Sequence, residues 1–181
     1  MYLIIMFLTM ILGPMFAGKT TYLINKYKEC EGVLTLKPSV DTRYDEVFIE
    51  SHDHKKIPTK IIKNIMDLKL EDIKKYKTIL IDEGQFFVGL NDWIRSMDEF
   101  EGRIYVSGLN GDFKRESFGE INKLISRCDD IIHLKAICSN CKKEASFSLK
   151  KIKDEKQVDV GGEDKYVPVC GECYSLYNQF F

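Results

Sequence analysis

The sequence has little proline, almost no net charge and no long uninterrupted apolar run, and each shortage excludes a class of protein. Four prolines and twelve glycines among 181 residues are too few for a collagen-like chain or a linker. A formal net charge of -1 argues against binding nucleic acid through the overall field, although it permits a local basic patch. With 44% hydrophobic residues, the composition excludes intrinsic disorder and predicts one domain with a small remainder.

The first 18 residues carry no charge, so a membrane segment has to be considered. A spanning helix needs about 20 apolar residues, and Gly13 and Pro14 interrupt this run early. A signal peptide needs a basic start and a small-residue cleavage site, and the pattern here fits neither. We therefore expect a buried parallel strand and no membrane association. Without an export signal, we expect a cytoplasmic, reducing compartment in which cysteines are thiols or metal ligands.

Apolar runs alternate with amphipathic stretches up to about residue 136. This alternation predicts an α/β domain with a parallel sheet covered on both faces. Strands are expected at 7–12, 33–36, 78–81, 103–107 and 131–136, with a strand-like stretch at 48–62, and helices at 19–30, 67–76, 90–100 and 121–128. From Ile137 onward the pattern changes to paired cysteines, lysines and a Gly-Gly pair. We expect two domains, 1–136 and 137–181.

One segment matches the phosphate-binding pattern G-x-x-x-x-G-K-[ST], and it stands between an expected strand and an expected helix, as that pattern requires. The last glycine lets backbone N–H groups approach phosphate oxygens, and the helix N-terminus adds partial positive charge. The lysine reaches the β- and γ-phosphates and the hydroxyl contacts Mg²⁺. A chance turn is the alternative that the flanking elements disfavour. The loop consists of Gly13, Pro14, Met15, Phe16, Ala17, Gly18, Lys19 and Thr20.

Two acids follow the apolar run 78–81. Proteins with this phosphate loop need a carboxylate at the end of a neighbouring strand to hold the Mg²⁺ shell, and Asp82 is the candidate. Glu83 is placed to act as a general base on water or on a substrate hydroxyl. The alternative is a strand that ends in two solvated acids. The residue types alone therefore indicate a phosphotransferase or an ATPase that uses Mg²⁺ and ATP.

Four of the six cysteines form two CxxC pairs, with 28 residues between the pairs. Two such pairs supply four thiolates to one tetrahedral ion, which is typical of structural zinc. A redox role would require a thioredoxin-like unit, and the sequence pattern lacks one. The expected zinc ligands are Cys138, Cys141, Cys170 and Cys173, and Cys30 and Cys128 are expected to be buried thiols in helices.

Taken together, these residues resemble the type II thymidine kinases, the cytosolic, viral and bacterial class. The similarity runs through residues 7–174 in the order of the family. It rests on the phosphate loop and the double CxxC, together with the segments 41–44, 82–87, 108–113, 117–119 and 161–166. The combination of Asp-Glu-Gly-Gln-Phe-Phe with Gly-Gly-x-Asp-Lys-Tyr before a CxxC is highly specific. Asn110, Glu116, Ser117 and Asp159 differ from residues common in the animal and viral members.

The resemblance implies a RecA-like core, a small zinc-binding domain with an inserted lid loop at about 150–168, and transfer of the γ-phosphate of ATP to the 5′-hydroxyl of thymidine. By the same likeness, Glu83 is the catalytic base, and Asp82 and Thr20 belong to the magnesium site. The family also implies a homotetramer that thymidine triphosphate inhibits. The phosphate loop would bind the phosphates of ATP together with Asp41, Thr42, Arg43 and Gln85. The nucleoside would contact Met15, Phe86, Leu109, Phe113, Phe118, Gln157, Val158, Asp159, Val160, Gly161 and Tyr166.

Several alternatives stay open at the level of the sequence. Composition alone favours a core role for the phenylalanines of the expected thymine pocket. An ATPase with a zinc-ribbon nucleic-acid module would need a basic face, and the near-neutral charge argues against such a partner. A non-catalytic nucleotide-binding protein would not be expected to keep Lys19, Asp82 and Glu83 together. His52 and His54 are expected to form a polar surface pair rather than a metal site.

Overall fold

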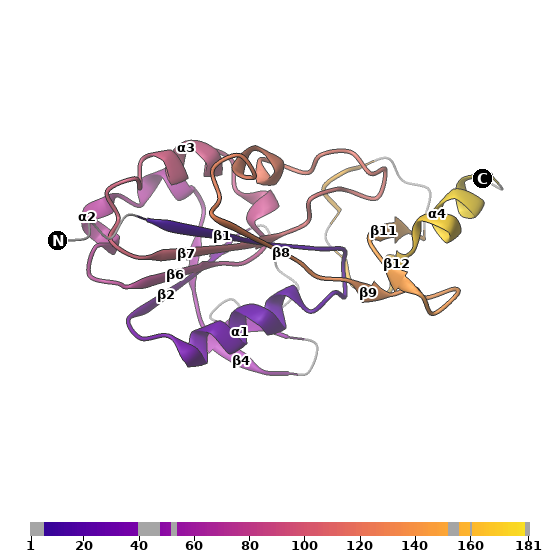
Figure 1. The fold of residues 1–181 in the computed structure, drawn as a ribbon, viewed down its shortest axis with the longest axis horizontal. Coiled ribbons are helices and arrows are strands. Elements are labelled where there is room, and N and C mark those ends of the chain that lie inside the picture. Colours follow the sequence, from indigo (N-terminus) through magenta and orange to yellow (C-terminus); the bar gives the residue numbers. More distant parts are fainter. Residues whose placement is uncertain (1–5, 40–47, 52–53, 152–155, 160, 180–181) are drawn as a thin grey trace.

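The computed structural model describes residues 6–39, 48–51, 54–151, 156–159 and 161–179, which form a parallel sheet followed by a smaller module (Figure 1). The sheet has the order β5–β2–β6–β7–β1–β8, and every neighbouring pair is parallel. The predicted α/β class is confirmed. The strands are β1 (Phe7–Leu12), β2 (Val33–Pro38), β5 (Lys60–Ile62), β6 (Thr78–Ile81), β7 (Arg103–Gly108) and β8 (Asp130–His133).

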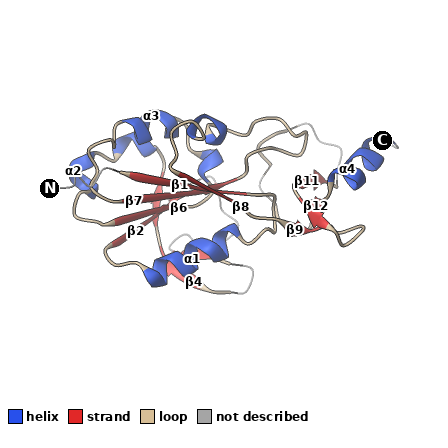
Figure 2. Cartoon of the chain, in the orientation of Figure 1, coloured by secondary structure: helices blue, strands red, loops and turns tan. Residues whose placement is uncertain are grey.

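Helices cover both faces of this sheet, as the continuous apolar strands require (Figure 2). One face carries α1 (Lys19–Glu29) and a hairpin of β3 (Phe48–Glu50) and β4 (Lys56–Pro58). The other carries α2 (Leu70–Ile73), α3 (Leu90–Arg95) and the 3₁₀ helices η1 (Ile65–Asp67), η2 (Gly84–Phe86) and η3 (Ile121–Leu124). Along β1 the side chains alternate, so Met10 packs in the core on the α3 side and Ile11 packs with Leu23 of α1.

Several predictions differ from the structure. The helix expected at 90–100 ends at Arg95, and the strand expected at 131–136 is β8, which ends at His133. The helix expected at 67–76 is divided into η1 and α2, because the Leu68 carbonyl accepts a hydrogen bond from the Trp93 indole (2.8 Å) and Lys69 is extended. The helix expected at 121–128 is the short η3. Neither remaining cysteine is a buried helical thiol: Cys30 follows the last residue of α1, Cys128 follows η3, and both are half-buried.

The small module lies beyond the carboxyl edge of the sheet (Figure 1). It consists of two antiparallel pairs, β9 (Ala136–Ile137) with β10 (Glu144–Ala145) and β11 (Phe147–Lys150) with β12 (Tyr166–Val169), followed by α4 (Gly171–Gln179). Its own apolar core includes Ala145, Val169 and Tyr174. The expected boundary between 136 and 137 falls inside β9. Among the described residues, no helix has both the length and the apolar character needed to cross a membrane.

Candidate functional site

The phosphate-loop segment connects β1 to α1, and its backbone has the conformations that a tight loop needs. Gly18, which precedes α1, has a φ of 82°. Gly13 packs so closely that a Cβ atom would lie 2.5 Å from the Leu134 carbonyl oxygen. The Lys19 side chain turns back into the loop and donates to the Pro14 carbonyl at 2.8 Å. The N-terminus of an eleven-residue helix therefore faces the loop together with a buried ammonium group, an arrangement that suits an anion.

Asp82 follows β6 and lies beside the phosphate loop. Its carboxylate accepts hydrogen bonds from Ser107 at 2.6 Å and from Thr20 at 3.3 Å. Asp82 is 5% exposed, so these hydroxyls fix its orientation. The paired Asp82 carboxylate and Thr20 hydroxyl are the oxygen ligands that a magnesium ion with bound phosphates requires. Ser107 was missed in the sequence, where a single serine at the end of an apolar strand gives little signal.

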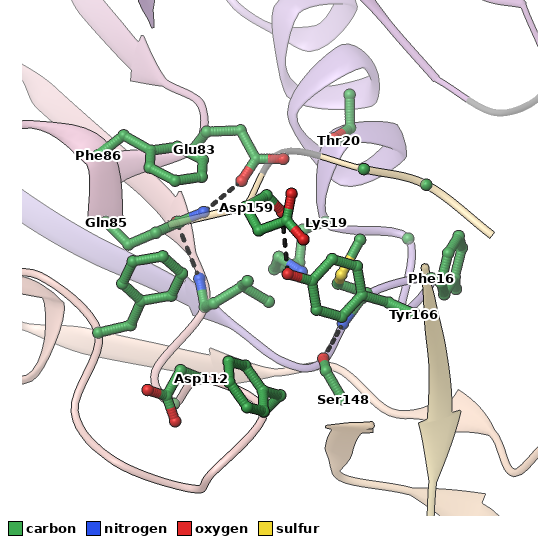
Figure 3. Close-up of a pocket in the computed structure, with 18 of the residues that line it drawn as sticks. Phe16, Lys19, Thr20, Glu83, Gln85, Phe86, Asp112, Ser148, Asp159 and Tyr166 are labelled. Carbon is green, nitrogen blue, oxygen red and sulfur yellow. Dashed lines mark hydrogen bonds between the residues drawn. The ribbon is translucent and has the colours of Figure 1, made fainter. Parts of the chain in front are cut away.

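Glu83 adopts a left-handed conformation, with φ 53° and ψ 43°. Its side chain lines the neighbouring cavity, whose lining does not include Asp82 (Figure 3). The carboxylate accepts a hydrogen bond from the Gln85 amide nitrogen at 2.5 Å, and the Gln85 amide oxygen accepts one from the Leu109 backbone at 3.1 Å. Gln85, expected to act on ATP phosphates, therefore lies between the predicted base and the pocket wall.

One cavity joins the phosphate loop to an apolar wall (Figure 3). The Phe86 and Phe118 rings meet edge to face, with centroids 5.4 Å apart. Both rings line the cavity, so this part of its wall is apolar, the kind of surface that suits a flat, neutral ring. All five residues expected to form the apolar wall line this cavity: Met15, Phe86, Leu109, Phe113 and Phe118.

The loop that carries Phe113 is held by Asp112. Its carboxylate accepts hydrogen bonds from the backbones of Lys114 (2.8 Å) and Glu116 (2.9 Å) and from the Gln157 side chain (2.7 Å). Asp112 is 6% exposed, so these bonds satisfy a buried charge. The Gln157 bond ties the pocket loop to the lid segment between β11 and β12. Asp112 had no assigned role in the sequence.

The lid segment reaches the cavity through Asp159, Gly161 and Tyr166. The Asp159 carboxylate forms ion pairs with Lys165 (2.5 Å) and with Lys150 (2.9 Å). Hydrogen bonds from Lys165 and then Lys150 hold the Asp159 pKa below its usual range. The Tyr166 hydroxyl donates to the Asp159 carbonyl at 2.9 Å. The Asp159 carboxylate is thus paired with two lysines, one on β11 and one in the segment before β12.

The other predicted site residues have mixed positions. Phe16, Gly18, Lys19 and Thr20 line the cavity, whereas Val158 is 55% exposed. Asp41, Thr42, Arg43 and Val160 lie outside the described residues. His54 bonds to Glu50 with its side chain 86% exposed, while His52 is not described. The cavity also includes residues to which the sequence analysis assigned no role in the site: Thr21, Glu50, Ser51, Gly111, Ser148 and Gly162.

Ser148 joins the two modules. It lies on β11, yet its hydroxyl accepts a hydrogen bond from the Met15 backbone in the phosphate loop at 2.9 Å (Figure 3). The two residues are 133 positions apart in the sequence. The small module therefore forms part of the cavity wall, which the CxxC pattern alone does not indicate.

The four cysteines of the two CxxC pairs come together in the small module. Their sulfur atoms all lie within 4.8 Å of one another, which suits one tetrahedral ion. Burial disfavours ionisation of Cys138, but backbone N–H donors from Cys141, Cys170 and Asn140 outweigh it and lower the Cys138 pKa to about 6. The Asn140 amide donates to the Cys173 sulfur at 3.2 Å. The donor set thus fits a structural zinc ion.

Comparison with known proteins gives a consistent result. Residues 6–174 match the thymidine kinase family. The thymidine kinase of Choristoneura fumiferana entomopoxvirus is 38% identical, with 96% of this chain and 98% of the relative covered. That of Acanthamoeba polyphaga mimivirus is 35% identical over 96% and 84%, and that of Mesomycoplasma hyopneumoniae 36% over 92% and 94%. Identity at this level over nearly the whole length places the chain in the thymidine kinase family.

Proposed function

We propose that this protein transfers the γ-phosphoryl group of ATP to the 5′-hydroxyl of thymidine, giving thymidine monophosphate and ADP. The observation that carries the proposal is that one cavity contains Lys19 and Thr20 of the phosphate loop, the Glu83 carboxylate and the phenylalanine wall. The cavity can therefore hold the donor phosphates and the nucleoside ring next to each other, with the Glu83 carboxylate beside them. Family membership supports the identity of both substrates.

In the proposed reaction, the phosphate loop binds the triphosphate and Lys19 balances its charge. Glu83 accepts the proton of the 5′-hydroxyl as the oxygen attacks the γ-phosphorus and the bond to the ADP oxygen breaks. Asp82 and Thr20 would hold Mg²⁺, which supplies charge neutralisation at the phosphates. Gln85 keeps the Glu83 carboxylate directed into the cavity. The lid residues Asp159 and Tyr166 limit access of water, which would otherwise compete as acceptor.

Finer parts of the proposal rest on the family resemblance. Thymidine triphosphate is expected to inhibit by placing its base against the phenylalanine wall and its phosphates in the phosphate loop. The homotetramer, the cytoplasmic location and a role in supplying DNA precursors by nucleoside salvage are carried over in the same way. The four clustered cysteines support one structural zinc ion in each chain. The units 1–136 and 137–181 remain the proposed domains.

The proposal is tested by measuring phosphotransfer from Mg-ATP to thymidine, deoxyuridine, deoxycytidine, the two purine deoxynucleosides and thymidine monophosphate. We expect thymidine to be phosphorylated and the purines to be inert. The matched variant Glu83→Gln keeps the size of the side chain and should lose about 10²-fold or more in turnover, while ATP binding is retained. Slow ATP hydrolysis that nucleic acid stimulates, with no nucleoside phosphorylated, would instead establish an ATPase.

A further inference from the structure

Three contacts connect the nucleoside side of the cavity to the cysteine module. The Tyr174 hydroxyl, on α4, donates to the Phe113 carbonyl at 2.8 Å. The Arg115 guanidinium carbon lies 4.2 Å from the centroid of the Phe147 ring and 5.2 Å from that of the Tyr174 ring. These two rings are themselves 5.8 Å apart. The loop that holds Phe113 is thus attached at two points to one aromatic pair.

The position of Tyr174 depends directly on the second CxxC pair. Tyr174 is the residue after Cys173, and its backbone N–H donates to the Cys170 carbonyl at 2.9 Å. It is 8% exposed and packs in the core of the cysteine module. A displacement of these cysteines would therefore move the Tyr174 hydroxyl away from the Phe113 carbonyl.

Arg115 also has the geometry of a constrained contact. Its φ of 66° lies in the left-handed region, which is unfavourable for a non-glycine residue. In this conformation its backbone N–H donates to the Asp112 carbonyl at 3.1 Å, while the guanidinium covers the ring pair. Cation–π contact with two rings offsets the backbone cost. The stacking thus reinforces the attachment that the Tyr174 hydroxyl makes.

We propose that Tyr174 is a positioning residue that fixes Phe113 at the nucleoside pocket, so that zinc binding by the four cysteines and nucleoside binding are thermodynamically coupled. The inference rests on the proposed function, because it takes the Phe113 side of the cavity as the nucleoside site. Coupling of this kind is reciprocal: zinc raises the affinity for thymidine by the same factor by which thymidine raises the affinity for zinc.

The test compares Tyr174→Phe with the wild-type protein. The substitution keeps the ring under Arg115 and removes only the hydroxyl. A neutral hydrogen bond has a net value equivalent to roughly two- to tenfold in an equilibrium constant. We therefore expect the KM and the Kd for thymidine to rise by about fivefold, with kcat and the KM for ATP nearly unchanged and one zinc retained per chain.

Two further variants complete the experiment. Arg115→Gln, at an exposed position, removes the stacking without disturbing the cysteine module, and should also weaken thymidine binding. It keeps the inference testable if Tyr174→Phe does not fold. Tyr76→Phe removes a tyrosine hydroxyl near α2, at the opposite end of the molecule (Figure 1), and should behave as wild type.

The coupling itself is measured without turnover. Zinc affinity is determined by competition with a chromogenic chelator, with and without thymidine and in the absence of ATP. Thymidine should raise the zinc affinity of the wild type, and by less in Tyr174→Phe. Unchanged thymidine binding in both variants, or a zinc affinity indifferent to thymidine, would overturn the inference while the kinase stands. A wild-type protein that neither binds nor phosphorylates thymidine would instead overturn the proposed function, and the inference with it.

Discussion

Gln85 is the residue whose replacement tests the site most directly, because both ends of its side chain are used. Its amide nitrogen donates to the Glu83 carboxylate and its amide oxygen accepts from the Leu109 backbone. The side chain is 4% exposed, so water does not replace either bond once it is lost. Gln85→Leu keeps nearly the same volume and removes both polar atoms. The effect thus comes from hydrogen bonding and leaves packing unchanged.

The magnitude follows from the two bonds. A hydrogen bond to a charged group contributes about 1.5–3 kcal/mol, and a buried N–H left without an acceptor costs about 1–3 kcal/mol. The Glu83 bond and the Leu109 amide together predict a loss of about 3–5 kcal/mol of folding free energy. At about 2–4 °C per kcal/mol for a chain of this length, the Tm should fall by about 10 °C. Turnover should fall on the order of tenfold to a hundredfold, since Glu83 loses its orientation.

The assay pairs thermal unfolding with kcat for thymidine phosphorylation, and the control is Trp93→Phe. That variant removes another buried hydrogen bond, from the indole to the Leu68 carbonyl at 2.8 Å, near α2 and α3 and outside the cavity. It should lower the Tm while kcat measured well below the Tm stays unchanged. A Gln85→Leu protein with wild-type kcat would show that Glu83 is oriented by something other than Gln85.

Three further predictions concern the glycine turn, the lid and the metal. Gly119→Ala should lower the Tm strongly, because Gly119 has a φ of +57° and a Cβ there would overlap the Gln85 carbonyl oxygen. The control Gly171→Ala has room for a Cβ and should keep the wild-type Tm. Equal Tm values for the two variants would contradict this reasoning. Asp159→Asn should expose residues 156–166 to protease and raise the KM for thymidine. Because the Asp159 pKa is lowered, the ion pairs of Asp159 with Lys150 and Lys165 should persist as the pH falls to ~5 and should break only below the ordinary carboxyl range. A pattern of protease cleavage that changes between pH 8 and pH 5 would refute this pairing. Metal analysis should find one zinc ion per chain in the wild type and a loss of that zinc in Cys170→Ser, because the four cysteine sulfurs lie within 4.8 Å of one another; an unchanged zinc content would remove Cys170 from the ligand set.

The parts of the site that the sequence predicts are those set by local chemistry. The phosphate loop needs only a strand, a glycine turn and a helix in succession, so its pattern is complete within residues 7–29. Asp82 is predictable for a related reason. The carboxyl ends of parallel strands lie at one edge of a sheet. Asp82, which follows β6, is therefore expected to lie beside the phosphate loop, which follows β1. The structure agrees, because Thr20 donates to Asp82.

The failures arise where tertiary contacts override local preference. The apolar spacing at 67–76 is helical, but the Leu68 carbonyl is committed to the Trp93 indole, which lies 25 positions away. Ser107 and Asp112 give no local pattern, because their importance depends on which strand end or loop lies opposite. The spacing of apolar residues predicts which face of a segment is buried, but it does not predict which other segment packs against that face.

The position of the lid shows why the cysteine module belongs to the site. In the β11–β12 pair, Lys150 lies opposite Tyr166 and Phe147 opposite Val169, which immediately precedes Cys170. Because side chains alternate along a strand, a slip of one residue in this register would turn Lys150 from Asp159 toward the opposite face. Four-residue strands specify register weakly by themselves. The β11 strand is attached to the phosphate loop through Ser148, and the β12 strand leads directly into the second pair of cysteines. We infer that these two attachments fix the register of the short β11–β12 pair, so that the segment between the two strands begins and ends at the cavity.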